Sequence, residues 1–216
     1  MKSWDPVWEK VFQTQVWGRY PGEHLVRFVA RNLYPRDRAR TRVLEVGCGP
    51  GANLWYLARE GFSTYGIDAS PTAVRQATER LTAEGLKADI REGDILRLPW
   101  PDRSFEAVID MECLYANDAE AAKSMLAEIR RVRVPGGLLY SQTLAGEMAP
   151  PSAPDAVAGP QSDKGFMRLS DRRSIGELYG AAFEILSVDR SDRTAENGAV
   201  KTSEWLIVCR KPERED

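Results

Sequence analysis

Residues 43–51 read VLEVGCGPG, an apolar strand that runs into a turn with three glycines, and a helical pattern follows from Asn53. Glycine has no Cβ, so such a turn lets the backbone bend sharply and approach a ligand closely. The free N–H groups of the following helix point toward whatever occupies the turn. The pattern therefore indicates a site for a nucleotide-type cofactor.

Length and composition limit the class of protein. The chain has 216 residues, enough for one domain with a full core. It carries 30 Lys and Arg against 32 Asp and Glu, so no basic field indicates nucleic acid or an anionic membrane as a partner. Separated cysteines and a single histidine argue against a zinc site and favour a reduced, cytoplasmic protein. We expect neither a signal peptide nor a membrane span, because no long apolar run is present.

Short apolar strands alternate with helices along the middle of the chain, which predicts a parallel sheet covered on both faces. We expect strands at residues 42–46, 63–67, 87–92, 107–111 and 137–143. A helix capped by Ser70 precedes Gly85, and further helices are expected at 119–132 and at 171–180, the last capped by Ser170. Residues 135–137, Pro-Gly-Gly, are expected to break the chain before the fifth strand.

The two ends of the chain depart from this alternation. Apolar residues at helical spacing within 4–12 and 25–29 predict an N-terminal helical cap, and residues 183–189 and 204–209 predict an antiparallel hairpin. Between them, residues 148–163 hold four prolines and predict a long loop. We interpret the chain as a single domain with a cap (1–41), a cofactor-binding core (42–143), a lid-like loop (144–170) and a helix with a C-terminal hairpin (171–216).

Two cofactors compete for the glycine turn. The dinucleotide pattern G-x-G-x-x-G/A fits Gly47, Gly49 and Ala52, with Asp68 following at the expected distance. S-adenosylmethionine also presents a ribose diol to a carboxylate at the end of the second strand. Asp68 therefore does not discriminate between the two.

Four other features favour S-adenosylmethionine. Glu45 lies inside the first strand, where a carboxylate suits an amino-acid tail, and Pro50 removes an N–H from a turn that would face a pyrophosphate. Asp94, after the third strand, supplies a second acid that suits an adenine amine. The C-terminal hairpin is foreign to the six-stranded dinucleotide fold.

With these residues in place, the chain resembles the class I S-adenosylmethionine-dependent methyltransferases. Residues 43–53 resemble their first motif, and GIDAS (66–70), GDI to LPW (93–100), FEAVID (105–110) and RVRVPGG (131–137) resemble those that follow in order. The resemblance implies an α/β, Rossmann-like sheet of seven strands in the order 3-2-1-4-5-7-6, with strand 7 antiparallel and helices on both faces. It also implies S-adenosylmethionine as cofactor and a small-molecule methyl acceptor. A non-catalytic cofactor-binding module and a nicotinamide-dependent oxidoreductase remain as alternatives.

The resemblance also assigns cofactor-binding roles to particular residues. Glu45 and the turn glycines would surround the methionine part, and Asp68 would bind the ribose hydroxyls. Asp110 would lie at the mouth of the active site. The segment WGRYP at 17–21 resembles the cofactor-closing segment of the branch with thiopurine and tellurite-resistance methyltransferases. The predicted cofactor-binding set is Trp17, Arg19, Glu45, Gly47, Gly49, Gly51, Asp68, Ala69, Ser70, Asp94, Ile95 and Asp110.

The sequence says less about the residues that would bind or activate the methyl acceptor. No (N/D)-P-P-(Y/F) signature follows Asp110, and Cys113 does not follow a proline as a nucleophile of cytosine methylation would, so nucleic acid is not the expected substrate. Candidates for a base or an acceptor-orienting group are Tyr115, Glu112 and His24. Each of them could equally be structural, and for His24 a capping or packing role is favoured. The sequence does not identify the acceptor, the methylated atom or the oligomeric state.

Overall fold

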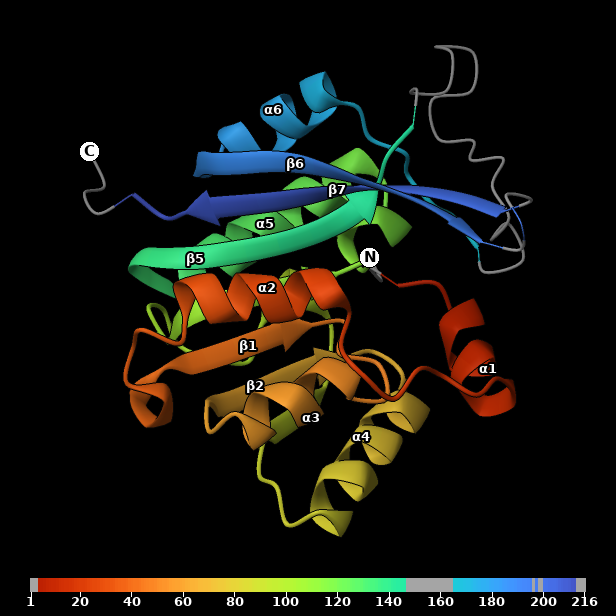
Figure 1. The fold of residues 1–216 in the computed structure, drawn as a ribbon, viewed down its shortest axis with the longest axis vertical. Coiled ribbons are helices and arrows are strands. Elements are labelled where there is room, and N and C mark those ends of the chain that lie inside the picture. Colours follow the sequence, from red (N-terminus) through yellow and green to blue (C-terminus); the bar gives the residue numbers. More distant parts are fainter. Residues whose placement is uncertain (1–3, 147–164, 196, 198–199, 213–216) are drawn as a thin grey trace.

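The structure, a computed structural model, describes residues 4–146, 165–195, 197 and 200–212. Helices and strands alternate as the sequence predicts, with a pair of helices before the first strand (Figure 1). The helices are α1 (Val7–Thr14), α2 (Glu23–Asn32), α3 (Ala52–Arg59), α4 (Pro71–Ala83), α5 (Ala119–Val132) and α6 (Arg172–Gly180). The strands are β1 (Arg42–Val46), β2 (Ser63–Asp68), β3 (Asp89–Glu92), β4 (Phe105–Met111), β5 (Arg133–Leu144), β6 (Glu184–Ala195) and β7 (Val200–Arg210).

The strands form one seven-stranded sheet in the order β3-β2-β1-β4-β5-β7-β6, which confirms the predicted topology. Strands β1 to β5 pair in parallel, and β7 is antiparallel to both β5 and β6. In β1, Glu45 aligns with Gly66 on one side and Ile109 on the other. The carboxyl ends of β1, β2 and β4 therefore meet at one edge of the sheet, beside α1 (Figure 1).

The core has two layers because successive residues of a strand point to opposite faces. Val43 packs with α2 and α3, through residues such as Phe28 and Leu57, on one face. Leu44 packs with α5 and α6, through residues such as Ile129, on the other. Figure 1 shows α2 and α3 in front of the sheet and α5 behind it.

The predicted break at residues 135–137 is wrong, because β5 begins at Arg133 and runs through it. Where β4 advances from Phe105 to Ala107, its partner advances from Arg133 to Leu138. The extra residues form a bulge, a place where a strand tolerates proline. Gly136, with φ of 71°, supplies the left-handed turn of that bulge.

Helix α6 begins at a different cap from the predicted Ser170. The Asp171 carboxylate accepts the Ser174 N–H at 2.7 Å, and the Ser174 hydroxyl accepts the Asp171 N–H at 3.0 Å, a reciprocal capping box. At α4 the prediction is confirmed, since the Ser70 hydroxyl accepts the Ala73 N–H at 3.1 Å. The third strand begins at Asp89, later than expected, and the predicted hairpin is confirmed but longer.

The long proline-containing loop predicted at 148–163 lies outside the described residues. Among the helices that the structure does describe, none has both the length and the apolar character needed to cross a lipid bilayer.

Candidate functional site

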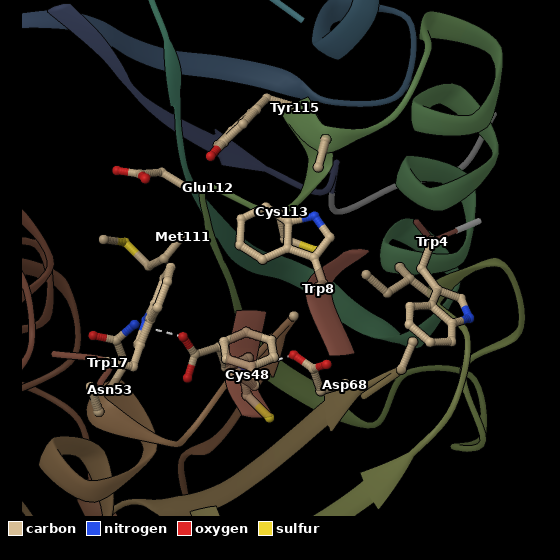
Figure 2. A pocket seen from close by; sticks show the side chains of 18 of the residues that line it. Trp4, Trp8, Trp17, Cys48, Asn53, Asp68, Met111, Glu112, Cys113 and Tyr115 are labelled. Atoms are coloured by element: carbon tan, nitrogen blue, oxygen red, sulfur yellow. Dashed lines mark hydrogen bonds between the residues drawn. The ribbon is translucent and has the colours of Figure 1, made fainter. Parts of the chain in front are cut away.

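A pocket of about 360 Å³ lies between α1 and the carboxyl ends of β1, β2 and β4 (Figure 2). Its volume falls within the range of about 300–1,000 Å³ that small-molecule sites occupy. This is the position at which open α/β sheets bind ligands. The lining residues include Trp4, Asp5, Trp8, Phe12, Trp17, Tyr20, Glu45, Gly47, Cys48, Gly49, Asn53, Asp68, Ala69, Gly93, Ile95, Met111, Glu112, Cys113, Tyr115 and Asn117.

The glycine turn forms the floor of the pocket and requires glycine at Gly47. This residue has φ of 65°, and a Cβ there would lie 2.3 Å from the Cys113 Sγ. A larger residue would therefore be strained by its backbone and would also clash with the segment that follows β4. The turn thus brings main chain close to the space that a ligand would fill.

Asp68 joins the turn to the end of β2. Its carboxylate accepts the Gly49 N–H at 2.8 Å and the Ser70 N–H at 2.9 Å, one on each oxygen. Each carboxylate oxygen has further acceptor capacity, so the group can still receive hydrogen bonds from a diol. Burial raises the pKa of Asp68, and these backbone hydrogen bonds oppose that shift.

Glu45 is a buried carboxyl with an incomplete set of partners. Its side chain is 1% exposed, and Oε1 accepts a hydrogen bond from the Asn53 amide at 2.6 Å. Its other oxygen, Oε2, has no hydrogen-bond partner among the described residues. Burial raises the Glu45 pKa to about 8, and the charges of Asp68 and Asp110 add to the shift. An ammonium group in the pocket would donate a hydrogen bond to Oε2 and would supply a positive charge beside the buried carboxyl.

Helix α1 and the segment that follows it cover the pocket with aromatic rings. Trp8, Phe12 and Trp17 form one cluster with ring centroids 5.3–6.1 Å apart. Glu9, on the same helix, accepts hydrogen bonds from the Thr72 hydroxyl at 2.6 Å and from the Ser70 hydroxyl. The roof of the pocket is thereby attached to the N-terminus of α4, where a carboxylate is favourable.

The segment after β4 contacts the turn through Cys113 and carries Glu112 and Tyr115 to the far end of the pocket (Figure 2). Glu112 has φ of 62°, and its carboxyl accepts a hydrogen bond from the Gln142 amide at 3.1 Å and shares another with Glu204. Burial raises the pKa of Glu112, as do the hydrogen bond and charge of Glu204. Tyr115 is 2% exposed, and its hydroxyl points to the same side of the pocket as Glu112 (Figure 2).

Several predicted site residues support the pocket without lining it. Asp110 is fully buried and accepts the Cys113 and Leu114 N–H groups at 3.0 and 3.1 Å, so it shapes the segment after β4 from beneath. Asp94 caps the turn that starts at Ile95, through the Leu96 N–H at 2.9 Å. Gly51 and Ser70 likewise lie behind the lining.

Two predicted residues lie away from the pocket. The His24 ring contacts the Ser191 hydroxyl of β6 at 2.9 Å, a contact that fits the packing interpretation, and a role as base stays a prediction. Arg19 is exposed and does not line the pocket, while its carbonyl accepts a hydrogen bond from Arg80. A role for Arg19 toward a cofactor carboxylate stays a prediction.

The structure also adds lining residues that the sequence did not single out. Trp4, Trp8 and Phe12 read as the apolar face of a helix, and that face covers the pocket. Asn53 lies in the first turn of α3 and contacts Glu45. Its position directly after the glycine turn was the signal available in the sequence.

Comparison with known proteins agrees with this geometry. Residues 43–137 match the family described as methyltransferase domain. The chain is 29% identical over 179 residues to norajmaline N-methyltransferase of Rauvolfia serpentina, with 81% of the chain and 58% of that protein covered. It is 41% identical over 101 residues to 2-methyl-6-phytyl-1,4-hydroquinone methyltransferase of Synechocystis, with 46% of the chain and 30% of that protein covered. The chain thus spans less than two thirds of the length of these relatives.

A solved S-adenosylmethionine-dependent methyltransferase from Methanosarcina mazei has the same fold. The TM-score is 0.71 at 19% sequence identity, with 90% of this chain and 100% of that chain covered. TehB from Haemophilus influenzae gives a TM-score of 0.68 at 18% identity, over 94% of this chain and 67% of that one. At these identities the likeness shows a shared fold, and the predicted relation to the tellurite-resistance branch stays a prediction.

Proposed function

We propose that the chain is an S-adenosylmethionine-dependent methyltransferase whose pocket under α1 transfers a methyl group to a small molecule; residues 43–137 match the family described as methyltransferase domain. The observation that carries this proposal is Glu45. A buried carboxyl beside a glycine turn, with one oxygen that has no partner in the described part of the chain, suits the ammonium of a methionine moiety. A dinucleotide phosphate brings no positive charge to it and would be repelled by its ionised form.

The other residues of the pocket fit the same cofactor. Asp68 has acceptor capacity left for the ribose hydroxyls, and Ile95 offers an apolar surface to the adenine ring. Trp17 lies at the edge of the roof, where it would close over the methionine part. We propose these contacts together with the predicted organisation of the chain as a single domain.

When bound, S-adenosylmethionine supplies a methyl group already activated by its positively charged sulfur. The chain then has to align the acceptor with that group and exclude water. Glu45 and Asp68 would fix the two ends of the cofactor, and the rings of Trp8 and Phe12 would keep the covered side dry. The acceptor would enter beside Glu112 and Tyr115, at the end of the pocket opposite the turn.

Calorimetric titration tests the cofactor directly. Micromolar binding of S-adenosylmethionine and S-adenosylhomocysteine, with none for NADH, is the expected result. Binding of NADH alone would refute the proposal. A variant with Ala at Asp68 should lose affinity for both adenosyl compounds while it stays folded.

A further inference from the structure

The charged side chains that line the pocket all have the same sign. Among the described lining residues are the carboxyl groups of Asp5, Glu45, Asp68 and Glu112, and no lysine, arginine or histidine. Asp5 caps the start of α1 through the Val7 N–H at 2.9 Å. Glu45 and Asp68 serve the cofactor in the proposed function. Glu112 is therefore left as the acid of the acceptor end, with no basic side chain beside it in the lining.

Glu112 does not stand alone, because a second carboxyl from a distant element contacts it. Glu204 comes from β7, is 7% exposed and shares a hydrogen bond with Glu112. The Gln142 amide of β5 donates to Glu112 at 3.1 Å. Burial and the neighbouring Glu204 carboxyl both disfavour the ionised form of Glu112, whereas a cation bound beside it would favour that form. In its ionised form Glu112 carries one negative charge and can accept one proton.

The walls around this pair are aromatic. Trp8 and Trp17 from the N-terminal segment and Tyr115 from the segment after β4 surround the same space as Glu112 (Figure 2). Aromatic faces attract organic cations, and the attraction grows where water is excluded. A pocket with aromatic walls and a net negative end favours a cation over a neutral or anionic molecule of the same shape.

We propose that the methyl acceptor is an organic amine, bound as its ammonium by Glu112 and the aromatic walls, with Glu112 as the base that frees its lone pair. This inference rests on the proposed function. The ammonium gives one proton to Glu112 and regains its lone pair. The nitrogen–carbon bond then forms as the carbon–sulfur bond breaks, and the electron pair of that bond stays on sulfur. The positive charge ends on the methylated nitrogen, and Glu112 returns its proton to water.

Glu204 acts through Glu112 and is a positioning residue in this scheme. Asp110, beneath the same segment, also raises the pKa of Glu112, whereas the Gln142 hydrogen bond lowers it. Removal of the Glu204 charge should therefore lower the Glu112 pKa. The pH at which methyl transfer reaches half its maximum should move to a lower value in Glu204→Gln, a shift that a merely structural role would not produce.

Matched probes test the acceptor class on the full chain loaded with S-adenosylhomocysteine. Tryptamine, tryptophol and indoleacetate share one ring and differ in charge, as do benzylamine, benzyl alcohol and benzoate. Calorimetry should show each amine binding at least about tenfold more tightly than its alcohol, as expected for a charge-assisted hydrogen bond. The acids should bind more weakly than the alcohols. Glu112→Gln should abolish the preference for amines, and Glu120→Gln, an exposed carboxyl of α5, should preserve it.

The possible outcomes distinguish a failure of the amine inference from a failure of the proposed function on which it rests. If S-adenosylhomocysteine does not bind, the proposed function fails and the amine inference falls with it. If it binds but the alcohols or acids match the amines, or neither amine binds, only the amine inference is overturned. A preference for amines that survives in Glu112→Gln would overturn the role of that residue.

Discussion

Cofactor binding should become tighter as pH rises through the neutral range, because Glu45 must lose a proton to pair with the ligand ammonium. In the free protein, burial raises the Glu45 pKa to about 8, and the charges of Asp68 and Asp110 contribute. Most of the free protein therefore holds Glu45 protonated at neutral pH, whereas the complex holds it ionised. Binding releases a proton, so the affinity rises with pH until the free-state pKa is reached.

The size of the effect follows from that pKa. A group with a pKa of about 8 is ionised in roughly 1% of molecules at about pH 6 and roughly 9% at about pH 7. The association constant for S-adenosylhomocysteine should therefore rise about ninefold over that unit, or about 1.3 kcal/mol. At about pH 7, each binding event should release about 0.9 proton.

Calorimetry in two buffers of different ionisation enthalpy measures both quantities. Glu45→Gln should bind more weakly and show neither the slope nor the proton release. Glu112→Gln is the matched control, because the pKa of Glu112 is also raised but its carboxyl lies at the acceptor end. The reasoning would be refuted if the affinity of the unmodified protein for S-adenosylhomocysteine did not change with pH. It would also be refuted if the same pH dependence persisted in Glu45→Gln.

Three further predictions concern the floor, the wall and the roof of the pocket. Gly47→Ala should lower the free energy of unfolding in urea by about 2–4 kcal/mol from backbone strain and the Cys113 clash; Gly61→Ala, also at positive φ but with open space around its Cβ, should cost only about 1 kcal/mol. Asp68→Asn should weaken S-adenosylhomocysteine binding by about 1–3 kcal/mol in calorimetry, with exposed Asp189→Asn unchanged, and equal affinities would contradict the ribose assignment. Glu9→Gln should lower the free energy of local opening of α1 by about 1 kcal/mol, measured as faster amide exchange in α1 with no change in β1. Unaltered exchange in α1 would argue against its attachment to α4.

Sequence reasoning reached the fold because its signals are local. The bounds of β1 and α5 follow from their apolar patterns, and the start of α4 follows from its capping residue Ser70. The order of the strands came from the resemblance of successive motifs. The errors at residues 135–137 and at Ser170 have a local cause too: proline and glycine read as a break can equally form a bulge, and adjacent Ser and Asp are both good caps.

The pocket was harder to predict, because its parts depend on tertiary contacts. Aromatic residues at helical spacing give the same sequence pattern whether they cover a core or a ligand. The sequence therefore did not indicate that Trp8 lines the pocket. Glu204 reads as a polar residue in a strand, and only the pairing of β7 with β5 brings it to Glu112. Asp110 was correctly placed at the end of β4, but the direction of its side chain, beneath the segment, depends on the turn at Glu112.

The two ends of the pocket come from different parts of the gene. The turn, Asp68 and Ile95 lie in one continuous stretch, whereas Glu112 comes from beyond β4 and Glu204 from the last strand. A duplicated copy can therefore accumulate changes at the acceptor end while the stretch that would hold the cofactor is left intact. Divergence among relatives should be concentrated in α1, the segment after β4 and β7, and a new acceptor can arise without a new cofactor site.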